Sequence, residues 1–324
     1  MSGGLSYRDA GVDVGAAERF VDAIGPLVRS THGSAVVTHP SRFAGLIRPE
    51  LEGMVDPLIA ATCDGVGTKV LVAAEPAHFE GLGRDLVAMN VNDLLPLGAR
   101  PLLFLDYLAT GRLDPERLEA AVRGIAAACR EAECALLGGE TAEMPDVHTT
   151  DTVEMAGFAI GLVDAARLPD PSRIRPGDPV AALPSTGLHS NGFTLARRSL
   201  ARGGHSLDDR FGDATLGDAL RTPTAIYVAD VLAVGFKAAA HITGGGLLGR
   251  AAAMLPDGLG MRLDPRAWER HEIFDLIATA GGVEPEEMAR TFNMGLGFMA
   301  IVGEVPEGWL HVGEITAEGG VRLG

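Results

Sequence analysis

The sequence predicts a two-domain protein that mixes helices and strands, of the α+β or α/β class. Its 324 residues are long for one domain and suit two. Hydrophobic residues make up 47% of the chain and aromatic residues only 5%, which is typical of layered cores built from Ala, Val, Leu and Ile. A charged, proline-containing stretch at 164–178 has no periodicity and separates the halves. We therefore place the domains at 1–166 and 167–324.

Helices of the first half have recognisable ends. Asp13 can cap a helix that runs to about residue 29, along which apolar residues recur at helical spacing. Asp114 and Pro115 supply an N-cap and a first-turn proline for a helix to about residue 130. A third helix is expected at 83–97, closed by Gly98. The apolar runs between these helices predict strands at 57–62, 102–108, 135–138 and 153–163.

The remaining segments complete the expected architecture. Residues 30–51 show no periodicity and predict a long loop, which in a compact enzyme is usually functional. In the second half, apolar runs predict strands at 179–183 and 296–302. Helices are expected at 193–201 and 223–234.

Charge and cysteine content narrow the class of function. A formal charge of −16 opposes binding to nucleic acid or to an anionic membrane, although a pocket can still hold a small anion. We see no secretory signal and no apolar run of membrane-spanning length. Three cysteines without CxxC spacing favour a reducing compartment over a disulfide framework or zinc site. We expect a cytoplasmic protein that binds neither nucleic acid nor membranes.

The sharpest local motif is DGVGTK, which directly follows a predicted strand and consists of Asp64, Gly65, Val66, Gly67, Thr68 and Lys69. Its glycines let the backbone approach a ligand, Lys69 offers a cation, and Asp64 offers an oxygen ligand for Mg²⁺. The GxxxxGK[ST] spacing of a Walker A loop is absent. Alone, such a glycine-rich turn is as often purely structural.

Two further polar clusters accompany this motif. Asn92 and Asp93 interrupt an otherwise apolar predicted helix. Gly139, Glu140 and Thr141 follow a predicted strand, where we expect the chain to turn. Asp64, Asp93 and Glu140 therefore predict an oxygen-rich Mg²⁺–nucleotide site, although each alone would more often be a cap or a surface charge.

The second half contributes hydroxyl, amide and imidazole groups at two steps from strand to helix, where backbone N–H groups bind anions. The first step has the sequence LHSNG and the second HITGGG. The triple glycine could equally be a close-packed helix start. Asn293 could be a turn residue or a substrate contact. The candidate residues here are His189, Ser190, Asn191, His241, Thr243, Gly244, Gly245 and Asn293.

Over nearly its whole length, the chain resembles the phosphoribosylformylglycinamidine cyclo-ligase family. The motifs that carry the resemblance occur in the order seen in that family: DAGVDV, DGVGTK, DLVAMNVND, PLLFLDYLATG, LLGGETAEMP, GLHSNGFTL, TPTAIY, HITGGG and FNMGLG. DGVGTK and GGE also resemble the wider ATP-binding superfamily of formylglycinamidine ribonucleotide synthetase, selenophosphate synthetase, thiamine-monophosphate kinase and a hydrogenase maturation protein. GETAEMP, LHSNG and HITGGG together point to the cyclo-ligases.

The resemblance implies a homodimer in which the mixed sheets of the N-terminal domains form a shared barrel, each followed by a C-terminal α/β sandwich domain. It implies that the N-terminal domain binds ATP and Mg²⁺ and dimerises, and that the C-terminal domain binds substrate. ATP and Mg²⁺ would be held by Asp64, Lys69, Asp93 and Glu140. Ser190, Asn191, Thr243, Gly244 and Gly245 would bind formylglycinamidine ribonucleotide.

The implied reaction is phosphorylation of the formyl oxygen by ATP, followed by attack of the amidine nitrogen and closure of an imidazole ring. Lys69 would offset phosphoryl charge, and His189 or His241 could move the proton. A related ATP-dependent kinase or synthetase, such as thiamine-monophosphate kinase, is one alternative. A degenerate nucleotide-binding regulatory homologue is another.

The sequence departs from the family pattern in three places. The usual glycine-rich loop is replaced by residues 41–46, which have fewer glycines. After HITGGG the family usually has an Asn and a Pro-Arg pair, whereas residues 247–252 read LLGRAA. Glu154 and Met155 replace the usual Asp before AGF. These changes bear on activity and substrate and leave the predicted fold unchanged.

Overall fold

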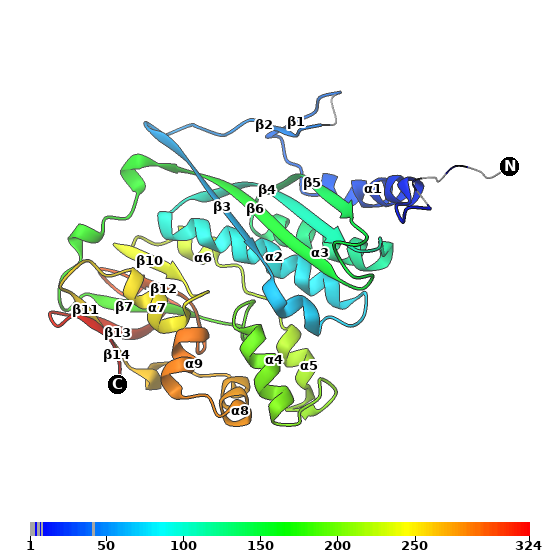
Figure 1. The fold of residues 1–324 in the computed structure, drawn as a ribbon. Helices are drawn as coiled ribbons and strands as arrows, with labels where there is room; N and C mark the ends of the chain where they lie inside the picture. The colour runs from blue at the N-terminus through cyan, green and yellow to red at the C-terminus, as the bar shows by residue number, and fades with distance from the viewer. Residues whose placement is uncertain (1–3, 5–6, 8, 41–42) are drawn as a thin grey trace.

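The computed structural model describes residues 4, 7, 9–40 and 43–324 (Figure 1). It is a two-domain protein of mixed α/β structure, with one four-stranded sheet in the first half of the chain and one six-stranded sheet in the second. The loop expected at 41–46 lies partly outside the described residues. The rest of the predicted loop carries a small hairpin of β1 (Val36–Val37) and β2 (Leu46–Ile47).

The first sheet is mixed. Its strand order is β3-β6-β4-β5, in which β4 and β5 are parallel and the other pairs are antiparallel. These strands are β3 (Pro57–Gly65), β4 (Arg100–Thr110), β5 (Ala135–Glu143) and β6 (Val153–Asp164). Because β5 continues to Glu143, the prediction that the chain turns at Glu140 is wrong. Pairing with β4 as far as Glu143 extends the strand.

Helices α2 (His78–Leu94) and α3 (Pro115–Glu131) pack on one face of this sheet, and α1 (Val14–Arg29) packs against α3 (Figure 1). The α2–α3 contact is very close. A Cβ atom added at Gly83 would overlap the Ala121 carbonyl, and one added at Gly124 would overlap the Glu80 carbonyl. The two helices therefore touch backbone to backbone.

The predicted helix ends are largely confirmed. Asp13 accepts from the backbone N–H of Ala16, and Asp114 accepts from that of Arg117. Gly98 adopts a left-handed conformation after α2 and the 3₁₀ turn that follows it. Helix α2 begins at His78, earlier than predicted, and it includes Gly83, which lies against α3.

The second sheet has the order β10-β12-β7-β13-β11-β14, with only β11 and β14 parallel among its described pairs. Its strands are β7 (Pro179–Pro184), β10 (Ala238–His241), β11 (Gly260–Leu263), β12 (Leu296–Ile301), β13 (Leu310–Thr316) and β14 (Gly320–Leu323). A two-stranded sheet of β8 (Arg210–Phe211) and β9 (Ala214–Thr215) lies apart from it.

A second hydrophobic core joins this sheet to its helices. The helices of this half are α4 (Phe193–Arg202), α5 (Leu216–Arg221), α6 (Val228–Leu232), α7 (Gly246–Ala253), α8 (Glu272–Gly281) and α9 (Pro285–Thr291). The helix predicted at 223–234 is wrong in length, because residues 223–227 are neither helix nor strand and only α6 is helical. The backbone of Thr224 and Tyr227 there bonds to α2 instead.

Short 3₁₀ helices connect the larger elements, and two of them occupy the aperiodic stretch between the sheets. Asp164 and Asp170 cap these two. The 3₁₀ helices are η1 (Gly67–Val72), η2 (Leu95–Leu97), η3 (Ala165–Arg167), η4 (Pro171–Arg173) and η5 (Pro265–Ala267).

The two halves pack together through α2. Val91 and Leu94 of α2 belong to the same buried cluster as Leu183, Tyr227 and Phe298 of the second half. Because α2 touches the first sheet on one side and the second half on the other, polar residues along it meet both.

Candidate active site

A buried ion pair joins the DGVGTK segment to the second half of the chain. The Lys69 ammonium lies 2.9 Å and 2.7 Å from the two carboxylate oxygens of Asp85 on α2, and it donates to the Thr222 carbonyl at 2.8 Å. Asp85 also accepts from the Thr224 backbone and hydroxyl at 2.7 Å and 2.6 Å. The side chains of Lys69 and Asp85 are 1% and 0% exposed. Burial lowers the pKa of Lys69, and the Asp85 carboxylate opposes that shift.

This pairing corrects the expectation for Lys69. Its ammonium is enclosed by Asp85, Thr222 and the Phe193 ring, whose centroid lies 5.6 Å away, so it does not offer a free cation to a phosphate. The sequence signals a lysine after glycines and cannot show that Asp85 is its partner. We assign Lys69 a positioning role.

Two turns further along α2, a carboxylate and an imidazole pair across the interface between the halves. His241 Nδ1 lies 2.8 Å from Asp93 Oδ1, and His241 Nε2 lies 3.4 Å from Asn92 Nδ2. Asn92 Oδ1 accepts from the Tyr227 backbone at 3.0 Å, which orients the amide with its nitrogen toward His241. Neutral His241 therefore carries its proton on Nδ1 and donates it to Asp93.

Asp64 lies beside this dyad at the end of β3. Its backbone N–H donates to Asn90 Oδ1 at 2.8 Å, which ties the strand end to α2. Burial raises the pKa of Asp64, and the nearby Asp93 carboxylate also raises it, while the Gly65 backbone, His241 and Arg250 lower it. Asp64, Asp93 and His241 thus share one electrostatic environment.

The LHSNG loop places a second imidazole close to the first. The rings of His189 and His241 are 6.3 Å apart. His189 adopts a left-handed φ of 60°, a backbone conformation that is strained for a non-glycine residue and is often found at functional sites. The Thr186 backbone donates to its Nε2 at 3.2 Å, so the neutral ring carries its proton on Nδ1.

Burial lowers the pKa of His189 well below its usual value, and the neighbouring basic groups of His241, Lys69 and His271 lower it further. The ring is therefore neutral at physiological pH. Its Nδ1–H is buried without a partner, so His189 can donate a hydrogen bond to a bound molecule and is poorly suited to act as a base.

Other predicted residues of the second half lie in the same region. Asn191 Oδ1 and Thr243 Oγ1 are buried without hydrogen-bond partners, while Gly244 and Gly245 are exposed. The Ser190 hydroxyl lies 3.4 Å from that of Thr224. Buried polar atoms without partners are rare in proteins and are often completed by a ligand or ordered water.

Asn293 has a structural role in this arrangement. Its side chain donates to the Gly187 carbonyl at 2.8 Å and accepts from the Ser185 hydroxyl and the Gly295 backbone. It therefore holds the loop that carries His189.

Glu140 lies away from the Asp93–His241 pair. It is exposed on β5 opposite Tyr107 of β4, whereas Gly139 lies opposite Asp106. Burial raises the pKa of Asp106 to about 7, and the neighbouring Glu140 carboxylate also raises it. Because β5 and β3 are three strand spacings apart, Glu140 is about 14 Å across the sheet from Asp64.

The prediction that Asp64, Asp93, Glu140 and Lys69 converge is therefore not met within one chain. Among the residues that the structure describes, no group of three His, Cys, Asp or Glu side chains could hold a metal ion. Gly139, Glu140 and Thr141 instead line a cavity with α1 and Asp106. What the structure does bring together is Asp64, Asn92, Asp93, His189 and His241, with the Thr243 loop nearby.

Comparison with known proteins decides the family. The model described as "AIR synthase related protein, N-terminal domain" matches residues 48–163, and the corresponding C-terminal domain model matches 175–323. The phosphoribosylformylglycinamidine cyclo-ligase of Anaeromyxobacter sp. (strain Fw109-5) is 47% identical over 314 residues, covering 95% of this chain and 91% of its own.

The chain belongs to the phosphoribosylformylglycinamidine cyclo-ligase family. The Finegoldia magna cyclo-ligase is 45% identical, over 92% of this chain and 89% of its own. The human trifunctional purine biosynthetic protein adenosine-3 is 45% identical over 93% of this chain, which matches 31% of that longer protein.

Solved structures of other proteins share the fold of this cyclo-ligase family member. Thiamine-monophosphate kinase from Stenotrophomonas maltophilia superposes with a TM-score of 0.64 at 20% identity, covering 93% of this chain and 95% of its own. Hydrogenase maturation protein HypE in complex with ATP gives a TM-score of 0.64 at 20% identity, covering 95% and 88%.

Sequence reasoning missed several residues of this cyclo-ligase site. Asp85, Thr224 and Tyr227 organise the interface, and Arg250 approaches Asp64. One signal was available for Asp85, since a charged residue within the apolar run of α2 must have a buried partner. Thr224 and Tyr227 follow no pattern that sequence periodicity can detect.

Proposed function

We propose that this chain catalyses ATP-dependent ring closure of formylglycinamidine ribonucleotide to aminoimidazole ribonucleotide, releasing ADP and phosphate. One observation carries the proposal: at the interface between the halves, Asp93 pairs with His241, beside the His189 ring, whose Nδ1 is buried without a partner. Family membership supports the same reaction. In this scheme residues 1–166 form the ATP-binding domain and residues 167–324 the substrate-binding domain, and the enzyme works in the cytoplasm.

Asp64 and Asp93 fit a magnesium ion. Mg²⁺ is usually held by one or two protein carboxylates, with water and substrate phosphates completing its shell. The two carboxylates are close enough for Asp93 to raise the pKa of Asp64, and a bound cation would relieve that repulsion. When bound, the ion would neutralise charge on the transferred phosphoryl group.

The second half supplies orientation for the substrate. His189 Nδ1–H and Asn191 Oδ1 are a buried donor and a buried acceptor, which suits recognition of an amidine and its formyl oxygen. Ser190, Thr243, Gly244 and Gly245 complete the substrate loops. His241, oriented by Asp93, is the better placed of the two histidines to accept the proton released on ring closure.

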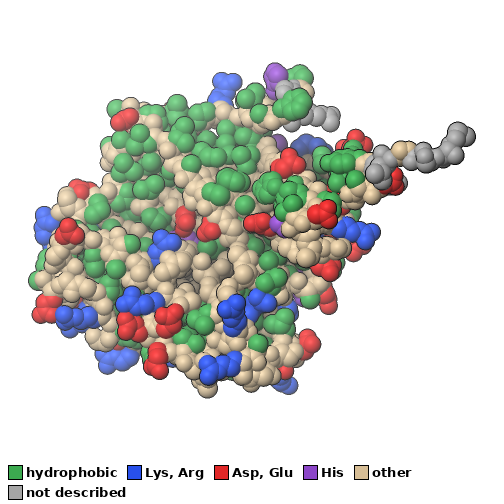
Figure 2. Space-filling view, in the orientation of Figure 1, with side chains coloured by type: hydrophobic (Ala, Val, Ile, Leu, Met, Phe, Trp, Pro, Cys, Tyr) green, Lys and Arg blue, Asp and Glu red, His purple; other side chains and the backbone are tan. Residues whose placement is uncertain are grey.

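We propose that the enzyme is a homodimer that joins the open faces of its first sheets. Ile59 is 76% exposed and Phe158 is 38% exposed, and the strand register puts both on the face away from the helices. Figure 2 shows hydrophobic side chains gathered on the face over β3 and β6. An exposed apolar sheet face of this kind requires cover, and a second copy offers a matching surface. Glu140 lies on the same face, so the dimer would place it at the subunit interface.

A charge on this face is expected to separate the subunits. The Phe158→Glu variant should weaken dimerisation by about 2 kcal/mol or more, or about 30-fold, because it buries a carboxylate without a partner. Sedimentation equilibrium of the wild type and the variant would measure the shift. Leu168→Glu is the control. Leu168 is also 38% exposed but lies outside this sheet face, so its replacement should leave the dimer intact. A monomeric wild type would contradict the proposal.

The activity itself is tested by product analysis. With ATP, Mg²⁺ and formylglycinamidine ribonucleotide, the wild type should release ADP, phosphate and aminoimidazole ribonucleotide in equal amounts. Asp64→Asn should lower the rate by about 10²-fold or more, since it removes a charged ligand where phosphoryl charge develops. Thiamine monophosphate should give no ADP release. ADP release with thiamine monophosphate alone, or ATP binding without turnover, would overturn the assignment.

A further inference from the structure

Arg250 lies on α7, one turn beyond the Thr243–Gly245 loop. We propose that Arg250 binds a phosphate group of a substrate at the start of α7. The proposal rests on the proposed function, because both substrates of that reaction carry phosphate groups. The guanidinium is planar and always charged, which suits paired hydrogen bonds to phosphate oxygens.

The helix geometry directs the side chain toward the loop. The Gly246 backbone donates to the Thr243 carbonyl at 2.9 Å and the Gly249 backbone to the Gly245 carbonyl at 3.0 Å, which starts the helix at this loop. Side chains in a helix lean toward its N-terminus and cover the preceding turn. Arg250, four residues after Gly246, therefore leans over the loop.

The Arg250 side chain has no partner of its own. In the part of the chain that the structure describes, no hydrogen bond or ion pair engages it, and its Nε is buried without a partner. Its guanidinium donors are therefore free for an anion that the chain itself does not supply.

A second unpartnered group lies at the same place. The Thr243 hydroxyl is buried without a hydrogen-bond partner, and Thr243 is only 2% exposed. Nothing lies within 4 Å of a Cβ built on the neighbouring Gly244, which is exposed, so the loop is open at that residue. A hydroxyl, an arginine N–H and the start of a helix together match the chemistry of a phosphate group.

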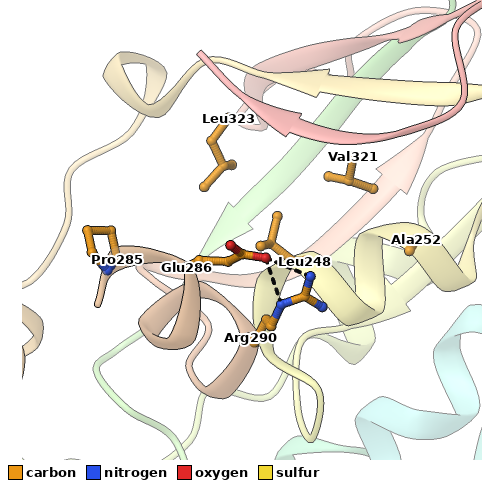
Figure 3. Close-up of a pocket in the computed structure, with 7 residues that line it drawn as sticks. All are labelled: Leu248, Ala252, Pro285, Glu286, Arg290, Val321 and Leu323. Carbon is orange, nitrogen blue, oxygen red and sulfur yellow. Dashed lines mark hydrogen bonds and ion pairs between the residues drawn. The ribbon is translucent and has the colours of Figure 1, made fainter. Parts of the chain in front are cut away.

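A second arginine near this helix, Arg290, differs from Arg250 because it has a partner within the chain. Figure 3 shows a cavity of about 400 Å³ on another side of α7, lined by Leu248, Ala252 and residues of α9 and β14. There Arg290 donates to the Glu286 carboxylate at 3.1 Å and 2.8 Å, as the dashed lines in Figure 3 mark. Arg290 already has its anion within the chain, whereas Arg250 does not.

Binding of inorganic phosphate to the full-length protein tests the site without turnover. Isothermal titration calorimetry should show phosphate affinity about 10- to 100-fold weaker in Arg250→Ala than in the wild type, the loss expected for a charged hydrogen bond. Arg250→Lys should keep part of the affinity, because it retains the charge and loses the paired geometry. Arg290→Ala is the matched control and should bind phosphate as the wild type does.

Kinetics then identify the source of the phosphate. A KM raised for formylglycinamidine ribonucleotide alone assigns the site to the ribosyl phosphate, and a KM raised for ATP alone assigns it to the nucleotide; either result supports the proposal. Unchanged phosphate affinity in Arg250→Ala overturns it, as does a fall in thermal stability with no change in affinity. If the wild type binds phosphate through Arg250 but makes no aminoimidazole ribonucleotide, only the proposed function fails.

Discussion

Replacing Asp85 by leucine is expected to destabilise the protein by about 3–5 kcal/mol, because it leaves the Lys69 ammonium buried without a counter-charge. The Thr224 N–H and hydroxyl would lose their shared acceptor in the same change. The midpoint of thermal unfolding should fall by about 4–7 °C, measured by calorimetry. Because the pair joins α2 to the second half, the interface between the halves should loosen first.

A double variant separates the charge from the packing. Lys69→Met combined with Asp85→Leu removes both charges and should recover more than half of the lost stability, since apolar residues often replace a buried pair at little cost. Glu314→Gln breaks the exposed pair with Arg262 and should change stability by about 0.5 kcal/mol or less. An unfolding midpoint of Asp85→Leu within about 2 °C of the wild type would show that the pair contributes little.

Replacing Asp93 by asparagine is expected to act on the reaction and to leave the fold stable. The change removes the carboxylate that orients His241 and one of the two candidate magnesium ligands, so kcat/KM should fall by about 10²-fold or more. The Asp93 side chain is 29% exposed, and an amide still fits its place, so the unfolding midpoint should move little.

Steady-state assays of aminoimidazole ribonucleotide formation, together with calorimetry on the same samples, test this separation. Asp275→Asn is the control, since its carboxylate is exposed and pairs only with Arg270 in the described chain. Unchanged kcat/KM in Asp93→Asn would remove the dyad from the mechanism. A stability loss as large as that of Asp85→Leu would assign Asp93 a structural role.

Local sequence signals predicted the helices and strands well where interactions between residues close in sequence determine the structure. Asp13 and Asp114 cap their helices because a cap needs only residues within one turn. The extension of β5 to Glu143 and the non-helical conformation of residues 223–227 depend on partners far away in sequence. The periodicity of a short stretch of sequence carries no information about those distant partners.

The site was predictable in its residue types and less so in its pairings. Motifs identified Asp64, Asp93, His189 and His241, which the structure brings together. They also grouped Lys69 and Glu140 with them, because a lysine or a glutamate beside glycines has the same pattern whether it faces a ligand, a buried aspartate or an open sheet. Only the packing of α2 against the second half distinguishes these cases.

The glycine contact between α2 and α3 makes the reaction geometry depend on residues that never approach a substrate. An alanine at Gly83 or Gly124 would force the two helix axes apart, since backbone carbonyls occupy the space that a methyl group needs. Asn92 and Asp93 lie on α2 and would move with it, so the imidazole of His241 would lose its alignment with them. Substitutions at this buried helix–helix contact would therefore lower activity in the way that active-site substitutions do, although their direct effect is on the packing of the two helices.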